Sequence, residues 1–451
     1  MVGGQTVSLT VDPLDGACRA RREPRPFFSI GRELCFNARV SSPTPADRPL
    51  RRNRDYLLLW SGQVVSTLGS TASTIIYPLL ILALTDSPKA AGIAGALRAI
   101  PYLVFSLPVG ALIDRWDRKR VMILCDLGRC AAVLAIPLAI AFDALSLALI
   151  YAVTLVEGTL YVFFNIAEVA ALPRVVPAAQ LPQAAAQNEA GFGAANIVGP
   201  SFGTFLFQFG RAMPFLADAA SYAVSVVTLV GIRARFERER AAPRRDLRHE
   251  VMEGLRWLWD NRLIRYMALL TGGLNLVLAG VPLLVIVLAK RLGAGDAQIG
   301  VIFSLAGIGG IVGSLLGARI QRRFRFGQVI VATLVIECLL FPLYAVVPSY
   351  FLLAAVAGGS SLLGPIYNVV QFSYRLSIIP DDLQGRVNSV FRLLAFGFIP
   401  LGAALSGVLI EQLGVLQAVV VFEAVFVLLA AATAANRHVR DAAPIGRAAA
   451  S

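Results

Sequence analysis

Charged residues and histidines are scarce in this sequence. Only 15% of its 451 residues are charged and two are histidines, whereas soluble domains average about 25% charged residues. Apolar residues make up 57% of the chain. They come in runs of about 20, the length that crosses the hydrocarbon core of a bilayer as a helix. These features exclude an ordinary soluble domain and indicate a helical membrane protein with many spans.

The residue patterns of metal, nucleotide and hydrolase sites are also missing. The five cysteines are scattered, and no pair has zinc-type spacing with His249 or His438. A GxxxxGK[ST] phosphate loop is absent, which argues against ATP-driven pumping by this chain alone. No nucleophile stands at a suitable spacing from a base, as an intramembrane hydrolase would need. We therefore expect no cofactor, no metal and no enzymatic activity.

The net charge of +13 is carried almost entirely by arginines that lie between the apolar runs. Basic residues in that position fix membrane topology, so we expect no nucleic-acid partner. They gather in one set of alternate loops, while the opposite set holds only Lys89, Arg211, Lys290 and Arg291. The positive-inside rule then predicts that both termini lie in the cytoplasm, under a plasma or inner cell membrane.

Twelve apolar segments predict an all-α bundle of twelve transmembrane helices in two halves of six. Their bounds are about 57–84, 92–113, 121–142, 146–168, 188–209, 213–232, 266–289, 298–318, 327–347, 350–373, 388–410 and 415–435. The predicted parts are a disordered cytoplasmic N-terminal tail (1–52), a first bundle (53–232), a linker (233–265), a second bundle (266–436) and a cytoplasmic C-terminal tail (437–451).

The tail and the linker differ from the spans in composition. Residues 1–50 are rich in arginine and proline and contain no apolar run long enough for a signal-peptide core. A disordered tail and an upstream extension from a misplaced start codon both explain this, and either way residues 1–48 are expected to be dispensable. In the linker, Leu255, Leu258 and Trp259 recur at helical spacing. They predict an amphipathic helix, either at the cytoplasmic membrane surface or as a solvated linker.

The two halves of the chain repeat one another. The stretch "GALIDRWDRKR" starting at Gly110 corresponds to "GARIQRRFR" starting at Gly317, and "VVPAAQL" (175–181) corresponds to "IIPDDLQ" (378–384). These matches have nearly constant offsets of 207 and 203 positions, which indicates a duplicated six-helix unit. Parallel repeats of this kind place a substrate site between the halves, near the bilayer midplane.

The charged stretch between the second and third predicted spans resembles the signature loop of the major facilitator superfamily. The matching residues are Gly110, Asp114, Arg115, Arg118 and Lys119. Glycine allows a neighbouring helix to approach closely, and Asp–Arg pairs can latch the two halves together at the cytoplasmic side. Glu168 is expected to pair with Arg115 or Arg118. Simple positive-inside anchoring is the alternative, and the second copy of the loop departs from the motif with Gln321 in place of an aspartate.

Longer stretches resemble the subgroup of that superfamily that contains the enterobactin exporter and the macrolide efflux proteins. They include "RNRDYLLLWSGQVVSTLGS" (52–70), "AALPRVVPAAQLPQAAAQNE" (170–189) and "FLADAASYAVS" (215–225). The resemblance implies secondary-active export of a small hydrophobic or siderophore-like molecule in exchange for protons, and we expect a monomer. An importer or symporter of a small metabolite is the main alternative, because fold alone does not set direction. A non-transporting membrane scaffold would not need the duplicated loops.

Polar residues at membrane depth are costly and by default face a cavity or the bundle interior. In the superfamily the first, fourth, seventh and tenth helices line the cavity. The resulting candidates for the substrate cavity are Gln63, Thr67, Ser70, Thr74, Arg98, Tyr161, Asn165, Asn275, Asn368 and Gln371. Hydrogen bonding between helices is the alternative for some of the serines and threonines.

Proton coupling has to depend on carboxylates, because no predicted span contains a histidine. Glu157, near the middle of the fourth span, is the first candidate and Asp218 is the second. An ionised carboxylate at that depth is costly unless it is paired or bound to cargo. Arg98 is a candidate counter-charge for Glu157 or a binding group for an anionic cargo. Asp126 and Arg129, three residues apart, are expected to form a local structural pair near the cytoplasmic end.

Overall fold

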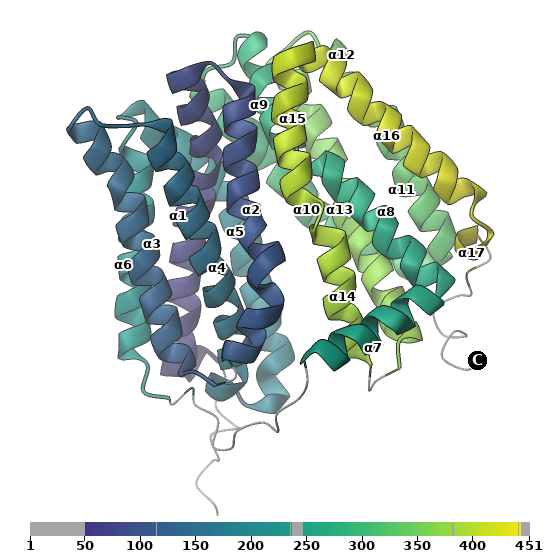
Figure 1. Ribbon diagram of the computed structural model, residues 1–451, viewed down its shortest axis with the longest axis horizontal. Helices are drawn as coiled ribbons and strands as arrows, with labels where there is room; N and C mark the ends of the chain where they lie inside the picture. The colour runs from purple at the N-terminus through teal and green to yellow at the C-terminus, as the bar shows by residue number, and fades with distance from the viewer. Residues whose placement is uncertain are drawn as a thin grey trace, which may run out of the picture. The chain divides into compact units, whose positions relative to one another are not determined.

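The structure is a computed structural model that describes residues 50–113, 115–234, 236, 247–380, 383–440 and 442, all within one compact unit. Every regular element in these residues is a helix (Figure 1). The first half contains α1 (Arg54–Thr85), α2 (Pro88–Ile113), α3 (Arg118–Ala141), α4 (Leu147–Val175), α5 (Leu181–Gln208) and α6 (Met213–Gly231). The second half contains α8 (Arg262–Leu278), α9 (Val281–Arg291), α10 (Asp296–Arg323), α11 (Phe326–Leu340), α12 (Leu343–Val346), α13 (Tyr350–Ile378), α14 (Gln384–Phe396), α15 (Ile399–Leu413) and α16 (Val415–Ala435).

Ten segments among the described residues are long and apolar enough to cross a membrane, and they confirm an all-helical membrane fold. The α8–α9, α11–α12 and α14–α15 pairs each count as one segment. Helices α2 and α5 stand outside this set, but they have 26 and 28 residues. At 1.5 Å per residue both exceed the roughly 30 Å of the hydrocarbon core. The count of twelve spans therefore stays a prediction.

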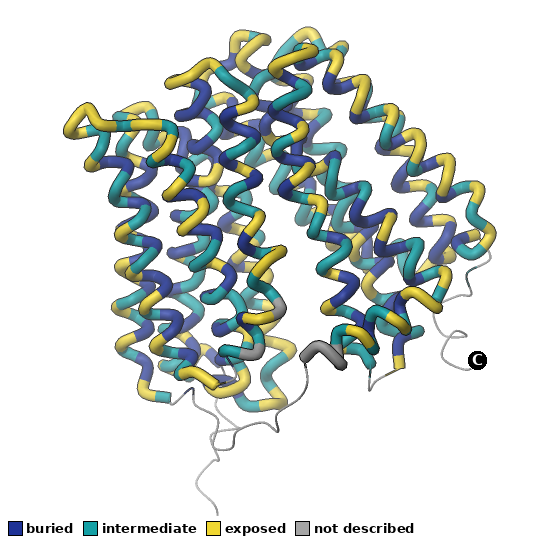
Figure 2. Tube along the Cα trace, in the orientation of Figure 1, coloured by how far each residue is buried: buried dark blue, intermediate teal, exposed yellow. Residues whose placement is uncertain are grey.

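Large apolar side chains cover the outer faces of the helices. Leu124, Val227 and Leu339 are 66%, 71% and 70% exposed, while buried residues face the neighbouring helices (Figure 2). Apolar surface on this scale marks a membrane-facing protein, because a soluble monomer rarely exposes large contiguous apolar patches. The outer surface of the bundle is therefore suited to lipid tails.

Three spans of the second half are broken, which the apolar runs did not predict. A proline stands at or just after each break: Pro282 in the first turn of α9, Pro342 between α11 and α12, and Pro400 in the first turn of α15. Proline cannot continue a preceding helix without losing a hydrogen bond, but it fits a first turn. Pro200, the counterpart of Pro400 in the first half, lies inside an unbroken α5.

The predicted amphipathic helix is α7 (Leu247–Asp260), which packs against α14 and α8. Leu258 is fully buried, whereas Trp259 is 50% exposed. An ion pair of 2.6 Å joins Glu253 of α7 to Arg386 of α14. Part of the apolar face of α7 is thus covered by the second half of the protein itself.

Equivalent helices in the two halves make the same kind of close backbone contact. Gly203 of α5 lies so near α1 that a Cβ atom would be 2.3 Å from the Ala72 carbonyl oxygen. Gly402 of α15 lies against α8 in the same way, with 2.0 Å to the Leu276 carbonyl oxygen. Only glycine permits such an approach, and its recurrence in equivalent helix pairs agrees with a duplicated unit.

The two halves contact each other through α2 against α15 and α5 against α10. At the end of the bundle that carries the connection between α1 and α2, glycines bring the α2 and α15 backbones together. A Cβ atom on Gly92 would be 2.6 Å from the Ala403 carbonyl oxygen, and one on Gly407 would be 2.5 Å from that of Pro88. We call this contact, between residues 88–95 and 403–411, the distal seam.

A carboxylate secures the distal seam from the side of α15. One oxygen of Glu411 accepts a hydrogen bond from the backbone N–H of Lys89 at 3.0 Å and another from the Ser87 hydroxyl. Lys89 stands in the first turn of α2, where N–H groups lack partners within the helix and an anion is favoured. The second half therefore caps a helix of the first half at this end.

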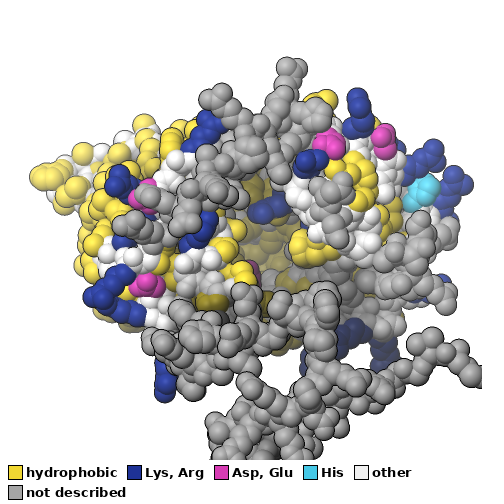
Figure 3. Space-filling view, turned by 90° about the horizontal axis from the view of Figure 1, so that it is seen from below, with side chains coloured by type: hydrophobic (Ala, Val, Ile, Leu, Met, Phe, Trp, Pro, Cys, Tyr) yellow, Lys and Arg dark blue, Asp and Glu magenta, His cyan; other side chains and the backbone are white. Residues whose placement is uncertain are grey.

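At the opposite end of the bundle the two halves are not joined by such a contact among the described residues. Viewed from that end, the molecule is hollowed between the two halves, and the floor of the hollow is mostly hydrophobic with basic side chains in it (Figure 3). Among the described contacts, α5 and α10 approach each other through Gly300 and Gly307 of α10, in its N-terminal part, and not near its end at Arg323. The halves are closed at the distal seam and separate toward the other end.

Candidate functional site

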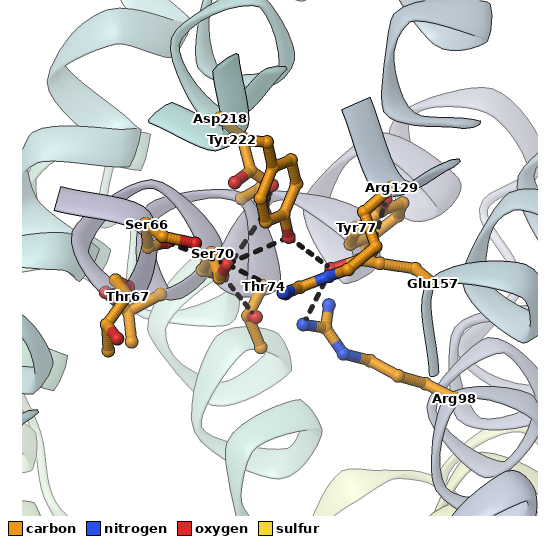
Figure 4. A network of polar contacts seen from close by, with 12 residues as sticks. Ser66, Thr67, Ser70, Thr74, Tyr77, Arg98, Arg129, Glu157, Asp218 and Tyr222 are labelled. Carbon is orange, nitrogen blue, oxygen red and sulfur yellow. Dashed lines mark hydrogen bonds and ion pairs between the residues drawn. The ribbon is translucent and has the colours of Figure 1, made fainter. Parts of the chain in front are cut away.

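Glu157 of α4 lies at the centre of a buried polar network (Figure 4). One carboxylate oxygen is 3.0 Å from the Arg98 Nη2 atom and accepts a hydrogen bond of 3.2 Å from the Tyr222 hydroxyl. The other oxygen accepts a hydrogen bond of 2.9 Å from the Tyr77 hydroxyl. The side chain is only 1% exposed. A buried carboxylate needs such pairing, because leaving its charge uncompensated costs several kcal/mol.

The local sequence brings Arg98 to Glu157. The next residue, Gly158, is so close to α2 that a Cβ atom would be 2.2 Å from the Arg98 carbonyl oxygen. The Arg98 side chain remains 26% exposed while the carboxylate is almost completely covered. Arg98 is therefore the more exposed member of the ion pair, although its Nη1 atom is buried and has no hydrogen-bond partner among the described residues.

Arg129 of α3 belongs to the same network. It contacts Asp126 at 3.5 Å, but it also donates a hydrogen bond of 3.2 Å to the Ser70 hydroxyl. Its guanidinium carbon lies 4.1 Å from the centre of the Tyr222 ring. The expected pair with Asp126 is present, but the expectation that it is only local is wrong. Arg129 thus contacts α6, against which α3 packs, and its long side chain also reaches Ser70 of α1.

Asp218 of α6 is completely buried beside this network. It accepts a hydrogen bond of 2.5 Å from the Ser73 hydroxyl, and the Ser221 hydroxyl lies 3.5 Å from its other oxygen. Gly69 makes room for it, because a Cβ atom there would be 3.0 Å from Asp218 Oδ1. Within the described residues, Asp218 has hydroxyl partners and no ion pair.

The other candidates of the first half line α1 and α4. Ser70 joins the network through a hydrogen bond of 2.9 Å with the Tyr222 hydroxyl. Thr74 and Tyr161 are exposed, whereas Gln63, Thr67 and Asn165 are half-buried. Tyr161 is 43% exposed, with its ring centre 5.6 Å from the Arg129 guanidinium carbon. Among the candidates of the first half, Thr74 and Tyr161 are thus the exposed ones, and Arg98 is half-buried like Gln63, Thr67 and Asn165.

The candidate residues of the second half make fewer side-chain hydrogen bonds than those of the first half. The Asn275 amide donates a hydrogen bond of 2.8 Å to the Ala395 carbonyl, and Asn368 is exposed. Both line a cavity of about 230 Å³ within the second half. Gln371 is 4% exposed, and its Nε2 atom has no hydrogen-bond partner among the described residues.

The charged hairpin anchors α3 to its neighbours. Asp114 lies outside the described residues. Arg118 is buried and donates a hydrogen bond of 3.1 Å to the Ala170 carbonyl of α4. Lys119 donates hydrogen bonds of 3.2 and 2.7 Å to the Val230 and Ile232 carbonyls at the end of α6. A cation at a helix C-terminus is favourable because carbonyl groups there lack partners within the helix.

Two expectations about this hairpin differ from the structure. A Cβ atom on Gly110 would meet nothing within 4 Å, so no helix approaches closely at this glycine. The described part of the chain also shows no ion pair between Glu168 and either arginine. Arg115 is exposed, whereas Arg118 is held at Ala170.

Tyr77, Tyr222 and Ser73 belong to the site but were missed by sequence analysis. Tyr77 stands three residues after Thr74 and continues the polar face of α1, and Tyr222 stands four residues after Asp218. Helical spacing could have identified both tyrosines. Ser73 lies on an adjacent face of α1, and only its contact with Asp218 shows its place.

Comparison with known proteins agrees with this architecture. Residues 45–446 match the family described as transmembrane secretion effector. The multidrug efflux pump Tap of Mycolicibacterium fortuitum is 27% identical over 382 residues, 79% of this chain and 90% of its own. The enterobactin exporter EntS of Escherichia coli O1:K1 is 25% identical over 335 residues, 74% of this chain and 80% of its own.

The solved structures show the fold. The crystal structure of the nucleoside transporter NupG aligns with a TM-score of 0.71 at 16% identity, covering 84% of this chain and 98% of its own. Sequence, architecture and family match lead to one assignment. The chain belongs to the transmembrane secretion effector family, within the efflux subgroup of the major facilitator superfamily.

Proposed function

We propose that this protein exports a small hydrophobic or siderophore-like molecule from the cytoplasm in exchange for protons. It would act by alternating access, as a monomer in the plasma or inner cell membrane with both termini in the cytoplasm. Relatives named as an efflux pump and a siderophore exporter support export of a small molecule. The arginine-rich loops support the orientation.

The observation that carries proton exchange is the ion pair between Arg98 and Glu157. The carboxylate is buried, whereas the Arg98 side chain is 26% exposed. Protonation of Glu157 removes the charge that holds Arg98. The released guanidinium then needs another partner or water, because an unpaired charge at this depth is costly. Its movement into the cavity opposes bound cargo, so that proton and cargo compete.

Deprotonation completes the cycle. When Glu157 loses its proton toward the cytoplasm, Arg98 pairs with it again and leaves the cavity free for cargo. The hydroxyls of Tyr77 and Tyr222 donate hydrogen bonds to the carboxylate in this state. In the proposed cycle, a form with the pair formed and the distal seam closed, as in the present structure, would receive cargo from the cytoplasm.

Transport into inverted vesicles tests this proposal. Vesicles containing the protein should accumulate at least one member of a panel of dyes, macrolides and siderophores when their lumen is acidic. Accumulation should stop when a protonophore collapses the proton gradient. Uptake that continues unchanged without the gradient would exclude proton exchange. Uptake only into right-side-out vesicles would favour the alternative, an importer or symporter.

We further propose that the charged hairpin is a latch and not only an anchor. Asp114→Asn should reduce transport severalfold but leave insertion near normal, because topology depends on the arginines. The measurements are vesicle uptake and the amount of membrane-inserted protein. Asp143→Asn, in the connection between α3 and α4 at the other end of the bundle, is the matched control. Wild-type transport by the Asp114 variant would leave simple anchoring as the role of the hairpin.

A further inference from the structure

The cavity in the second half is separate from the network at Glu157 and contains an acid of its own. It lies between α8, α11, α13 and α16. Its lining includes Glu337, Asn275, Ser360, Phe341, Tyr344 and Phe426. Lysine and arginine are absent from the described residues that line it. A carboxylate therefore faces this cavity without a basic side chain.

Glu337 is buried as deeply as the acids of the first half, but it lacks their partners. Its side chain is only 7% exposed, and it lines the cavity. Within the part of the chain that the structure describes, no hydrogen bond of standard geometry and no ion pair reaches its carboxylate. Glu157, at 1% exposure, has three such partners. A carboxylate at membrane depth is retained at considerable cost, and such residues by default mark a functional site.

The surroundings of Glu337 suit a cation with N–H donors. The Ser360 hydroxyl lies beside the Glu337 and Tyr344 side chains, and among the described residues it makes no hydrogen bond of standard geometry. It offers a second oxygen acceptor next to the carboxylate. Phe341 forms edge-to-face contacts with Tyr344 and Phe426, at ring-centre distances of 5.3 and 5.0 Å. Aromatic rings attract cations through their faces and provide apolar contact for the carbon atoms of a ligand.

We infer that the Glu337 cavity binds a protonated amine carried by a small hydrophobic cargo. The carboxylate supplies the counter-charge, the oxygen acceptors receive the ammonium N–H groups, and the aromatic side chains contact the adjoining carbon atoms. At about 230 Å³ the cavity is below the usual range for drug-sized ligands, so it accommodates an amine-bearing part of the molecule. This inference rests on the proposed export function, and it adds the chemical class of the cargo.

A matched pair of fluorescent probes tests the inference in purified protein in detergent. Monodansylcadaverine carries a primary amine, and its N-acetyl derivative is neutral but otherwise alike. Wild-type protein should bind the amine at least about tenfold more tightly, the effect of one hydrogen bond to a charged group. Glu337→Gln should abolish this preference. Glu189→Gln is the control, because Glu189 is an acid of α5, in the other half, that does not line the cavity.

A second measurement needs no variant. Dicyclohexylcarbodiimide labels buried carboxyl groups, and mass spectrometry identifies the labelled residue. The amine probe should slow labelling of Glu337 in wild-type protein, whereas the acetylated probe should not. Equal labelling of Glu337 with and without the amine, or an unchanged amine preference in folded Glu337→Gln protein, would overturn the inference.

These readouts are independent of proton exchange, because binding and labelling are measured without a gradient. Amine preference that depends on Glu337 together with gradient-independent transport would reject the antiport mechanism and keep this site. Gradient-driven transport with no amine preference in wild-type protein would keep the mechanism and reject this site.

Discussion

Replacing Glu157 by glutamine is expected to abolish proton-driven export. Glutamine resembles the protonated side chain and cannot lose a proton, so Arg98 stays released throughout the cycle. Uptake into inverted vesicles should fall to the level of vesicles without the protein. Cargo binding should persist but weaken, because in the proposed mechanism the released Arg98 opposes bound cargo. The decisive measurement is cargo-induced proton release from purified protein, which should occur in wild type and disappear in Glu157→Gln.

The control for this variant is Glu423→Gln, which removes a carboxylate at membrane depth outside the network. It should release protons and transport like wild type. If Glu157→Gln and wild-type protein release equal amounts of protons, the coupling role moves to Asp218. The hydroxyls of Ser73 and Ser221 would then be the groups that respond to the proton.

Adding a single methyl group to the distal seam should destabilise the conformation described here and favour one in which the seam is open. Gly407→Ala places a Cβ atom 2.5 Å from the Pro88 carbonyl oxygen, too close for the two backbones to keep their positions. Overpacking of this kind costs about 1–3 kcal/mol, which changes the ratio of two conformations by about 5- to 150-fold. The predicted result is a shift toward a form with the seam open, with most transport lost.

Spin labels at Lys89 and Gln412, which are exposed on either side of the seam, measure this shift. Gly407→Ala should lengthen the distance between the labels relative to wild type. Gly95→Ala is the matched control in the same interface, because its Cβ atom would lie 3.5 Å from the Ala403 Cβ atom, an ordinary contact. An unchanged distance in Gly407→Ala would show that the seam can relax without opening.

The helical fold was predictable because the membrane requires it. Each apolar run is helical, as one helix or, in three spans of the second half, as a broken pair, since a chain in hydrocarbon must satisfy its backbone hydrogen bonds within itself. The helix ends and breaks were less predictable. Helix α4 continues to Val175, past the predicted end at 168, so Glu157 lies in the first half of the helix, before its midpoint at Tyr161. Pro200 and Pro400 occupy equivalent positions, but only Pro400 begins a new helix, and nothing in their sequence neighbourhoods distinguishes the two.

The candidate site was predictable in its charges and not in its connections. Glu157 and Arg98 stand out because charge is rare at membrane depth. The hydroxyls of Tyr77 and Tyr222 did not stand out, because tyrosine is common in apolar helices and only its neighbours show whether the hydroxyl is used. The position of Arg129 depends on how α3 is rotated about its axis. That rotation is set by packing against α4 and α6, which no single helix sequence specifies.

The distal seam also has a consequence for the energy supply of the cell. A contact in which two helix backbones touch through glycine leaves no room for a file of water molecules, and water files conduct protons. If the hollow on the other side admits cargo as proposed, the Gly92–Gly407 contact would act as electrical insulation during that step. Under the proposed exchange, the membrane potential would then be spent only when Glu157 carries a proton through the complete cycle. A leak at this seam would discharge the membrane even with no cargo present.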